Sequence, residues 1–383
     1  MESSPKFQLD IFSLQEKKHA MSSLLLSRLS RLCMRKPPAL RVKKYLSGAR
    51  YLSETSICRI VRAEHCQYSS RDESVSKLVI RNVNAWEEKD DEVLEKLVPT
   101  ELMTAAGTIG ASHGWVATLK ETVVCLQDDL NPRASDSDPK RISLPRLETL
   151  PHCQTQLVTN VAMSSSSPDD EDCILAVKFV GPQLSLCRPA EKNKKWVNIR
   201  IEDPGFFNSR VMYSKRDKMF SMLDCGGTHI GYWDLEKHRS RNLGSCSYYY
   251  KEFVQSELQQ LSKCYRSEHL VEAPTGETFI VKWYSDRSER NFGIPCWQRF
   301  MVFKIQYDKI CTAVSTNDIG DLCIFLSTKG EPFSVKASLY GLNPNCIYYV
   351  RDFDFGKVSI HDNVWIGGLG FSPVPYFIPP QSS

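Results

Sequence analysis

Residues 173–201 read CILAVKFVGPQLSLCRPAEKNKKWVNIRI, and this stretch contains three short runs with the signature of β-strands. The last run, WVNIRI, places Val197, Ile199 and Ile201 on one face and polar residues on the other. Alternation with period two is typical of an antiparallel sheet that is exposed to water on one side. The stretch therefore predicts consecutive strands joined by short turns.

The same signal recurs from about residue 105 onward, at intervals of about 10–15 residues. The further strand-like runs are ASHGWVATL (111–119), TVVCL (122–126), SRVMYS (209–214), MFSML (219–223), HIGYWDL (229–235), TFIVKWY (278–284), RFMVFKIQY (299–307), KICTAVS (309–315), DLCIFLS (321–327), FSVKAS (333–338) and CIYYVRD (346–352). A turn at Gly226-Gly227 is expected before the run at 229–235.

Only one segment beyond residue 100 has a helical pattern. It is YYYKEFVQSELQQLSKC (248–264), in which Val254, Leu258 and Leu261 recur at helical spacing. One helix among about a dozen strands excludes a wound α/β sheet and leaves a pair of sandwiches, a large barrel or a propeller. The number of strands favours an all-β β-propeller with one inserted helix, of about six blades, with five or seven as alternatives.

Residues 54–104 are expected to be a linker. It would hold a short strand, KLVIRNV (77–83), and a helix in which Val93, Leu94 and Leu97 share a face before Pro99 ends it. The Leu-Pro signature that opens an F-box is found neither here nor upstream. The propeller is expected over 105–370, followed by a C-terminal tail at 371–383.

The stretch from Met21 to Ser53 contains eight Lys and Arg residues and no acid, and it is rich in Ser and Leu. This composition is typical of an organellar transit peptide. We predict import into mitochondria, with the chloroplast as the alternative, and with residues 1–20 as an upstream extension. If residues 1–20 block import, a cytoplasmic or nuclear location follows. A disordered basic tail or a nucleic-acid-binding arm is the other interpretation.

The basic charge of the chain belongs to this leader. The whole sequence carries +4, whereas residues 54–383 carry −4, which disfavours a domain-wide nucleic-acid surface. No apolar run is long enough for a membrane span, so no membrane insertion is expected. The fourteen cysteines are scattered without a C-x-x-C pair, which favours reduced thiols in the core.

Several blocks of sequence, taken in order, carry a family resemblance. They are IGASHGWVATL (109–119), DDLNP (128–132), LP-x-L-x-x-LP (144–151), and the segments at 161–189, 209–222, 230–235, 277–283 and 320–352. Over about 105–370 the chain resembles the plant F-box-associated family of domain of unknown function 295. The resemblance implies a β-propeller that in many relatives follows an F-box and captures proteins for ubiquitination. It also implies the branch in which an organellar presequence replaces the F-box, and it carries over no catalytic residue.

The tetrapeptide Ser112-His113-Gly114-Trp115 is the most enzyme-like motif. A Ser nucleophile needs a base close in space and a third group that orients the base. Adjacent residues of a strand point to opposite faces, so we expect Ser112 and His113 to point apart. Trp115 is interpreted as a blade anchor, and Gly114 as relief of crowding.

Two acidic loops are candidate cation sites, since clustered carboxylates bind hard cations. The first holds Asp128, Asp129, Asp136 and Asp138, and the second holds Asp169, Asp170, Glu171 and Asp172. Neither has the spacing of a calcium loop, so both are interpreted as solvated turns. Trp233-Asp234 occurs once and without a repeat period, so it does not indicate a WD repeat. No catalytic, cofactor-binding or metal-binding residue is therefore assigned, and no cofactor is expected.

The leading hypothesis is a non-enzymatic propeller that binds other proteins in a plant organelle. One alternative is an enzyme with a site in the axial pocket, where carboxylates such as Asp128 or Asp318 would converge. The other is an organellar nucleic-acid-binding protein, which the negative charge of residues 54–383 makes the weaker choice.

Overall fold

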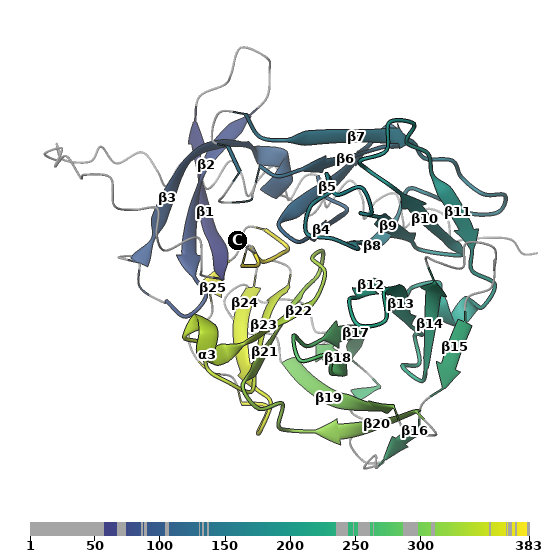
Figure 1. Ribbon diagram of the computed structural model, residues 1–383. Helices are drawn as coiled ribbons and strands as arrows, with labels where there is room; N and C mark the ends of the chain where they lie inside the picture. Colours follow the sequence, from purple (N-terminus) through teal and green to yellow (C-terminus); the bar gives the residue numbers. More distant parts are fainter. Residues whose placement is uncertain are drawn as a thin grey trace, which may run out of the picture. The chain divides into compact units, whose positions relative to one another are not determined.

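Six sheets follow one another along the chain and form the blades of a β-propeller (Figure 1). The structure is a computed structural model. It describes residues 57–66, 74–85, 87, 90–103, 107–129, 131, 134–135, 138–234, 244–247, 249–251, 261–262, 264–285, 298–307, 311–351, 354–364, 366, 370–371 and 374–380. The predicted leader and upstream extension lie outside these residues.

The first three blades are built from antiparallel strands in chain order. Blade 1 contains β1 (Cys58–Cys66), β2 (Val75–Asn82) and β3 (Glu92–Pro99). Blade 2 contains β4 (Gly110–Ser112), β5 (Trp115–Lys120), β6 (Val123–Gln127) and β7 (Arg141–Arg146). Blade 3 contains β8 (Val158–Met163), β9 (Leu175–Phe179), β10 (Gln183–Cys187) and β11 (Val197–Arg200).

Blade 4 also follows chain order, whereas blades 5 and 6 depart from it. Blade 4 contains β12 (Val211–Ser214), β13 (Met219–Leu223), β14 (His229–Asp234) and β15 (Gly244–Ser247). Blade 5 has the order β17 (Tyr265–Glu272), β18 (Thr278–Ser285), β19 (Gln298–Tyr307), β20 (Cys311–Thr316) and β16 (Tyr249–Lys251). Blade 6 has the order β22 (Phe333–Lys336), β21 (Leu322–Ser327), β23 (Cys346–Arg351), β24 (Asp354–Ser359) and β25 (Gly370–Phe371). The short helical elements of the described chain are η3 (Thr100–Met103), η4 (Pro204–Phe206) and α3 (Ala337–Tyr340).

The inner strands β4, β8, β12, β17 and β22 contact one another in turn around the axis (Figure 1). Buried apolar residues fill the space between neighbouring blades. Ala162 and Leu184 of blade 3, for example, share a cluster with Val211 and Phe220 of blade 4. Apolar area removed from water is the main stabilising term, so each blade depends on its neighbours.

The predicted linker at 54–104 is wrong, because its described residues include the three strands of blade 1. The strand predicted at 77–83 is confirmed as β2, but the predicted helix is the strand β3. In β3, Val93 and Leu97 are exposed, whereas Lys96 is buried and donates from Nζ to the carbonyl of Asn131 at 2.7 Å.

The predicted C-terminal tail is also wrong in its described part. Residues 374–380, here called the closing segment, contain the buried side chains of Tyr376 and Phe377. Ile378 pairs with Cys58 of β1 in an antiparallel bridge, in which the amide of Ile378 donates to the Cys58 carbonyl at 3.1 Å. The closing segment therefore joins the end of the propeller to its first blade.

The helix predicted at 248–264 is tested only at its edges. Tyr249–Lys251 is the strand β16, which contradicts a helix there, and Leu261 is helical and buried. Residues 252–260 lie outside the described residues.

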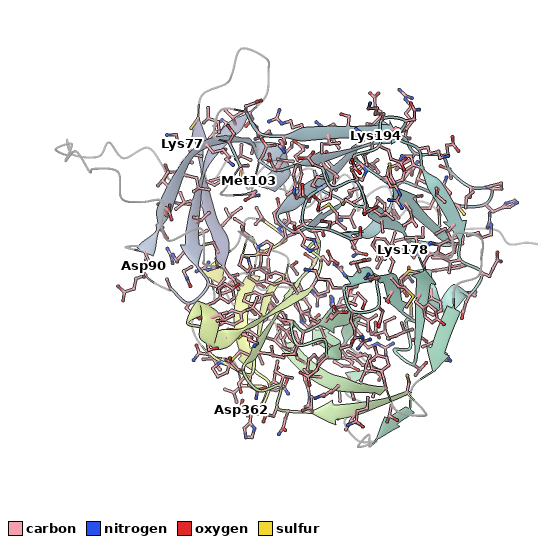
Figure 2. The ribbon with its side chains drawn as sticks, in the orientation of Figure 1. Lys77, Asp90, Met103, Lys178, Lys194 and Asp362 are labelled. Carbon is pink, nitrogen blue, oxygen red and sulfur yellow. The ribbon has the colours of Figure 1, made fainter. Side chains whose placement is uncertain are left out.

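A buried lysine connects blade 3 to the turn that precedes blade 4. Lys178 of β9 donates from Nζ to the carbonyls of Phe179, Gly181 and Phe207, the last two at 2.9 Å. Figure 2 shows Lys178 between these blades, whereas Asp362 projects from the perimeter. Three carbonyl acceptors satisfy the three donors of an ammonium group, so Lys178 holds the two blades together.

Eleven cysteines have described side chains and all eleven are free; the five that are buried agree with the prediction of core thiols, and the other six are half-buried. Among the helices of the described residues, none has the length and apolar character that a membrane crossing requires.

Candidate functional site

The centre of the ring is crossed by the loop that joins β21 to β22. We call residues 327–331 the plug. The Ala111 amide of β4 donates to the Lys329 carbonyl at 3.1 Å, and the Glu331 amide donates to the Ala111 carbonyl at 2.8 Å. The plug thus pairs with the inner strand of blade 2, far from its own blade in sequence.

Arg210, immediately before β12, holds the plug from blade 4. Its Nη1 donates to the Thr328 carbonyl at 3.0 Å, and its Nη2 donates to the Gly330 carbonyl at 2.9 Å. Burial lowers the pKa of Arg210 to about 10, which still leaves the guanidinium charged at neutral pH. The plug is therefore fixed by backbone and side-chain donors from two blades.

One face of the plug forms the floor of a cavity of about 230 Å³, here called the axial cavity. Its walls come from the ends of β4, β12 and β17, from the start of β22 and from the closing segment. Apolar walls are supplied by Met212, Tyr213, Pro274, Pro332, Phe333 and Phe377. Polar groups come from Ser112, His113, Lys215, Glu272 and Glu331.

Ser112, His113 and Glu331 meet at the floor of the axial cavity. Ser112 Oγ lies 2.5 Å from Glu331 Oε2 and 2.9 Å from His113 Nδ1. The prediction that Ser112 and His113 point apart is wrong, because His113 lies in a tight turn with φ 52° rather than in extended backbone. Gly114 follows with φ 85°, so its role is to allow the turn rather than to relieve crowding.

This arrangement differs from a catalytic triad. In a triad the imidazole lies between the serine and the acid, whereas here Ser112 lies between His113 and Glu331. The hydroxyl of Ser112 also accepts a hydrogen bond from the Met163 amide at 3.2 Å. Glu331 reaches His113 Nδ1 only at 4.0 Å, which is too long for a hydrogen bond. The serine oxygen is therefore committed to holding blades 2, 3 and 6 together.

Burial controls the protonation of both titratable groups on the floor. It raises the pKa of Glu331 to about 7, against the opposing hydrogen bonds from Ser112 and from the Tyr213 amide. It lowers the pKa of His113 to about 4, and the positive charge of Lys215 acts in the same direction. Near neutral pH the imidazole is uncharged, and the carboxyl is divided between its two forms.

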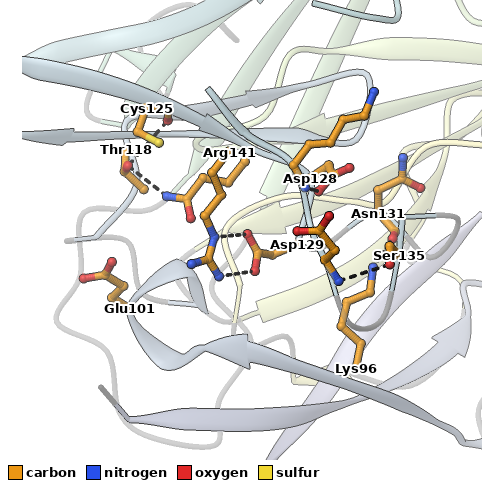
Figure 3. A network of polar contacts seen from close by, with 12 residues as sticks. Lys96, Glu101, Thr118, Cys125, Asp128, Asp129, Asn131, Ser135 and Arg141 are labelled. Atoms are coloured by element: carbon orange, nitrogen blue, oxygen red, sulfur yellow. Dashed lines mark hydrogen bonds and ion pairs between the residues drawn. The ribbon is translucent and has the colours of Figure 1, made fainter. Parts of the chain in front are cut away.

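The acidic residues proposed for an axial enzyme site do not reach the axial cavity. Asp128 and Asp129 lie between β6 and β7. Asp129 is fully buried and accepts a bidentate contact from Arg141, in which Nη2 lies 2.8 Å from Oδ1 (Figure 3). Asp128 accepts from the Lys140 amide at 2.7 Å. Asp318 accepts from the Gly320 amide in the turn before β21. Each of these carboxylates stabilises local structure, and the burial of Asp128 and Asp129 contradicts the solvated turn predicted for them.

The remaining acidic loop residues agree with the prediction of solvated turns where they can be seen. Asp169 pairs with Lys140, Asp170 accepts from Ser165, and Asp172 is exposed near Arg188. Asp138 and Glu171 are exposed, and Asp136 lies outside the described residues. Within the part of the chain that the structure describes, no group of three His, Cys, Asp or Glu side chains is placed to hold a metal ion.

Both tryptophans singled out from the sequence are structural. Trp115 is buried in the cluster between blades 2 and 3, which confirms its interpretation as a blade anchor. Trp233 is buried between blades 3 and 4. No sequence motif points to Glu331, which lies between two strand signals, or to Arg210, which lies at the start of the strand signal at 209–214.

The match to a protein family agrees with the fold. The sequence profile described as KIB1-4 beta-propeller matches residues 57–368. This range begins at blade 1, in agreement with the structure and not with a domain that begins at residue 105. Among curated proteins, none matches the sequence significantly.

Solved structures resemble the chain weakly. The Cps50 (Swd1) β-propeller domain of Myceliophteria thermophila is 10% identical, with a TM-score of 0.35 over 81% of this chain and 88% of that one. The GH93 α-L-arabinofuranosidase of Fusarium graminearum is 8% identical, with a TM-score of 0.34 over 86% and 88%. The WD40 domain of SCAP from fission yeast is 7% identical, with a TM-score of 0.33 over 86% and 90%. Likenesses at this level bear on no site or activity of this chain.

The family match runs from β1 of blade 1 to β24 of blade 6, so it includes strands of all six blades. The chain therefore belongs to the KIB1-4 beta-propeller family, whose propellers are typically F-box-associated.

Proposed function

We propose that the protein is a non-enzymatic interaction module that binds another protein over the mouth of the axial cavity. The observation that carries the proposal is the cavity itself, which has apolar walls from several blades above a floor of internally bonded polar groups. A volume of about 230 Å³ suits one side chain rather than a large cofactor. Protein interfaces concentrate their binding energy in a few side chains that are buried in pockets of the partner.

The partner segment is expected to insert one apolar side chain. The polar groups of the floor are already paired, because Glu331 accepts from Ser112 and from the Tyr213 amide. Glu272 likewise accepts from Ser214 and from the Lys215 and Arg216 amides. The walls above them therefore offer mainly apolar contact.

Proximity labelling in plant cells, with the labelling enzyme fused to the full chain, tests this proposal. The variant Lys215→Glu/Pro274→Glu adds charge at the mouth, where both side chains are exposed. The wild type should label a reproducible partner set, the mouth variant should lose its main members, and Lys192→Glu on blade 3 should retain them. An unchanged set in the mouth variant would place docking elsewhere, and a random set for the wild type would end the interaction hypothesis.

We place this activity in a plant organelle, with mitochondria ahead of chloroplasts, on the composition of residues 21–53. Fluorescent fusions of residues 1–60 and 21–60 test the location. Import of the shorter fusion alone would mean that residues 1–20 block the signal. If neither fusion enters an organelle, the leader hypothesis fails.

The second candidate is an acyl-transfer enzyme at the same cavity, favoured by the 2.9 Å contact between Ser112 Oγ and His113 Nδ1. Two observations count against it. Ser112 is 4% exposed, and its hydroxyl also bonds to Glu331 and to the Met163 amide. Binding to organellar nucleic acid remains the weaker alternative, because residues 54–383 carry a net negative charge.

A further inference from the structure

The imidazole of His113 leaves one nitrogen open in the axial cavity. Its Nδ1 lies 2.9 Å from Ser112 Oγ at the floor, whereas the side chain as a whole is 23% exposed and lines the cavity. The edge of the ring that carries Nε2 therefore points away from the floor. Among the described residues, Nε2 has no hydrogen-bond partner, and it is not one of the buried polar atoms that lack one. A side chain that enters the cavity can therefore reach this nitrogen.

The hydrogen bonds of Ser112 decide whether Nε2 accepts or donates. A hydroxyl has one proton and two lone pairs. When Glu331 is ionised, Ser112 gives its proton to the carboxylate and accepts from the Met163 amide, so its second lone pair accepts from His113. A neutral imidazole carries one proton, and in His113 that proton is then on Nδ1. The cavity thus offers a bare Nε2, which is an acceptor.

A proton on Glu331 reverses this chain of hydrogen bonds. Oε2 is the oxygen that takes the proton, because Oε1 faces the Tyr213 amide, which is itself a donor. One proton taken up at Nε2 of His113 moves the Nδ1 proton to Ser112 and the Ser112 proton to Glu331, so the chain gains one proton in total. In this second form every hydrogen bond is kept, and Nε2 is a donor.

Burial separates the two titratable groups of the chain of hydrogen bonds. It lowers the pKa of His113 to about 4 and raises the pKa of Glu331 to about 7, so between pH 6 and pH 8 the imidazole stays neutral and the carboxyl changes form. Lys215 favours both the ionised carboxylate and the neutral imidazole. The ionisable side chains around this pair come from β12, β17 and their flanking residues and from the plug: Arg210, Tyr213, Lys215, Glu272 and Lys329. Above pH 7 the acceptor form therefore predominates.

We propose that the axial cavity receives a tryptophan side chain of the partner, whose indole N–H donates to Nε2 of His113. This inference rests on the proposed function, because it names the side chain that a docked protein inserts. Tryptophan combines a large apolar surface with one donor and no acceptor. Tyr213, Phe333 and Phe377 give the ring apolar walls, and the bare Nε2 gives the N–H its acceptor. A tyrosine hydroxyl matches less closely, because its own lone pairs also need donors.

NMR of the full chain, with isotope-labelled imidazole nitrogens, tests the control of Nε2 by Glu331. The signals of His113 are those that disappear in His113→Asn. The wild type should carry the His113 proton on Nδ1 at pH 8 and on Nε2 at pH 6. Glu331→Gln cannot ionise, so its His113 should keep one tautomer at both pH values. A proton on Nε2 at pH 8 in the wild type, or one tautomer at both pH values, would overturn the inference.

Peptide titrations followed by the same His113 signals test the occupant. The probes are acetyl-Gly-Trp-Gly-amide, its counterpart with 1-methyltryptophan, which lacks the N–H, and acetyl-Gly-Tyr-Gly-amide. At pH 8 the wild type should bind the tryptophan peptide about fivefold more tightly than the methylated one, as expected for one hydrogen bond. This preference should be lost at pH 6 in the wild type, and in Glu331→Gln it should not change with pH.

Three results would contradict the tryptophan anchor. They are equal or absent binding of the two tryptophan peptides at pH 8, tighter binding of the tyrosine peptide, and a preference in the wild type that is unchanged at pH 6, which would come from the bulk of the methyl group. Proximity labelling with the mouth variant judges the proposed function separately. Loss of partners in that variant without binding of the tryptophan peptide would refute tryptophan as the anchor and leave docking at the mouth intact.

Discussion

Ser112 Oγ and Glu331 Oε2 lie 2.5 Å apart, although 219 residues separate them in the sequence. The same hydroxyl accepts from the Met163 amide, so one small side chain links blades 2, 3 and 6 beneath the axial cavity. Hydrogen bonds to buried groups are expensive to lose. The stability of the ring should therefore depend on this contact.

Replacing Ser112 by Ala should lower the free energy of unfolding by about 1–3 kcal/mol, because the Met163 amide and the Glu331 carboxyl lose a buried partner. Urea unfolding followed by tryptophan fluorescence measures the change. Ser166→Ala, at an exposed position, is the control and should lie within about 0.5 kcal/mol of the wild type. Equal midpoints for the two variants would contradict the structural role of Ser112.

Ser112 should resist a serine-directed probe. Its hydroxyl is buried and lies between His113 and Glu331 rather than beside a base that an acid orients. Incubation of the native protein with a fluorophosphonate, followed by mass spectrometry, should give no adduct on Ser112. A stoichiometric adduct that depends on His113 would instead favour the enzyme alternative.

Glu331→Gln should change how stability depends on pH. The pKa of Glu331 is about 7 in the folded protein, above its ordinary value of 4.5, so the fold favours the protonated form. The raised pKa contributes about 3 kcal/mol at most to the free energy of unfolding. This contribution is complete below pH 4.5 and is lost as the pH rises to 7. Relative to the wild type, Glu331→Gln should therefore gain stability between pH 5 and pH 8 in thermal or urea unfolding.

His113 should make stability depend on pH in the opposite direction from Glu331. Its folded pKa of about 4 lies below the ordinary 6.5, so stability is lost as the pH falls from 6.5 towards 4. His113→Asn suits the left-handed backbone and removes this loss, since Asn tolerates positive φ. Parallel pH profiles for His113→Asn and the wild type between pH 4 and 7 would show that the imidazole is not buried as described.

Lys178→Met should destabilise the contact between blades 3 and 4. The ammonium donates to three carbonyls, two of which, Gly181 and Phe207, are 2.9 Å away, and methionine leaves them without this donor. A loss of about 3 kcal/mol is expected in urea unfolding. Lys192→Met, at an exposed site on the same blade, should be neutral. No difference between the two variants would exclude a locking role for Lys178.

Tyr376→Phe should weaken the attachment of the closing segment. The buried Tyr376 hydroxyl donates to the Leu102 carbonyl at 2.5 Å, and its removal should cost about 1–2 kcal/mol. Hydrogen exchange should then report faster exchange at Ile378 and in β1, with little change in blade 4. Uniformly faster exchange throughout the ring would show instead that the closing segment does not open locally.

The strands that could be predicted from the sequence are those in which the apolar positions of the sequence are also the buried positions of the structure. β9 and β19 show this well, since most of their apolar residues lie where the blades pack, whereas in β11 Ile199 is buried but Val197 is exposed. In β3 the relationship is reversed, because Val93 and Leu97 are exposed and Lys96 is buried with its ammonium on the Asn131 carbonyl. The apolar residues of this segment therefore recur at helical spacing, and the sequence predicts a linker where the structure has the first blade.

The candidate site was less predictable than the fold, for a physical reason. Ser112 and His113 stand out in the sequence, but their orientation depends on a turn with positive φ at His113. Glu331 becomes part of the site only because the plug crosses the ring to pair with Ala111. Contacts of this kind depend on closure of the whole propeller, and no local periodicity records them.

The pairing of Cys58 with Ile378 also bears on how the protein is made. Blade 1 emerges from the ribosome before the other blades, but its partner in the closing segment is synthesised after all six blades. Contacts between residues that are distant in sequence form slowly. During synthesis the first blade must therefore wait with an unpaired edge, and we expect chaperones to hold the nascent chain until translation has passed residue 380.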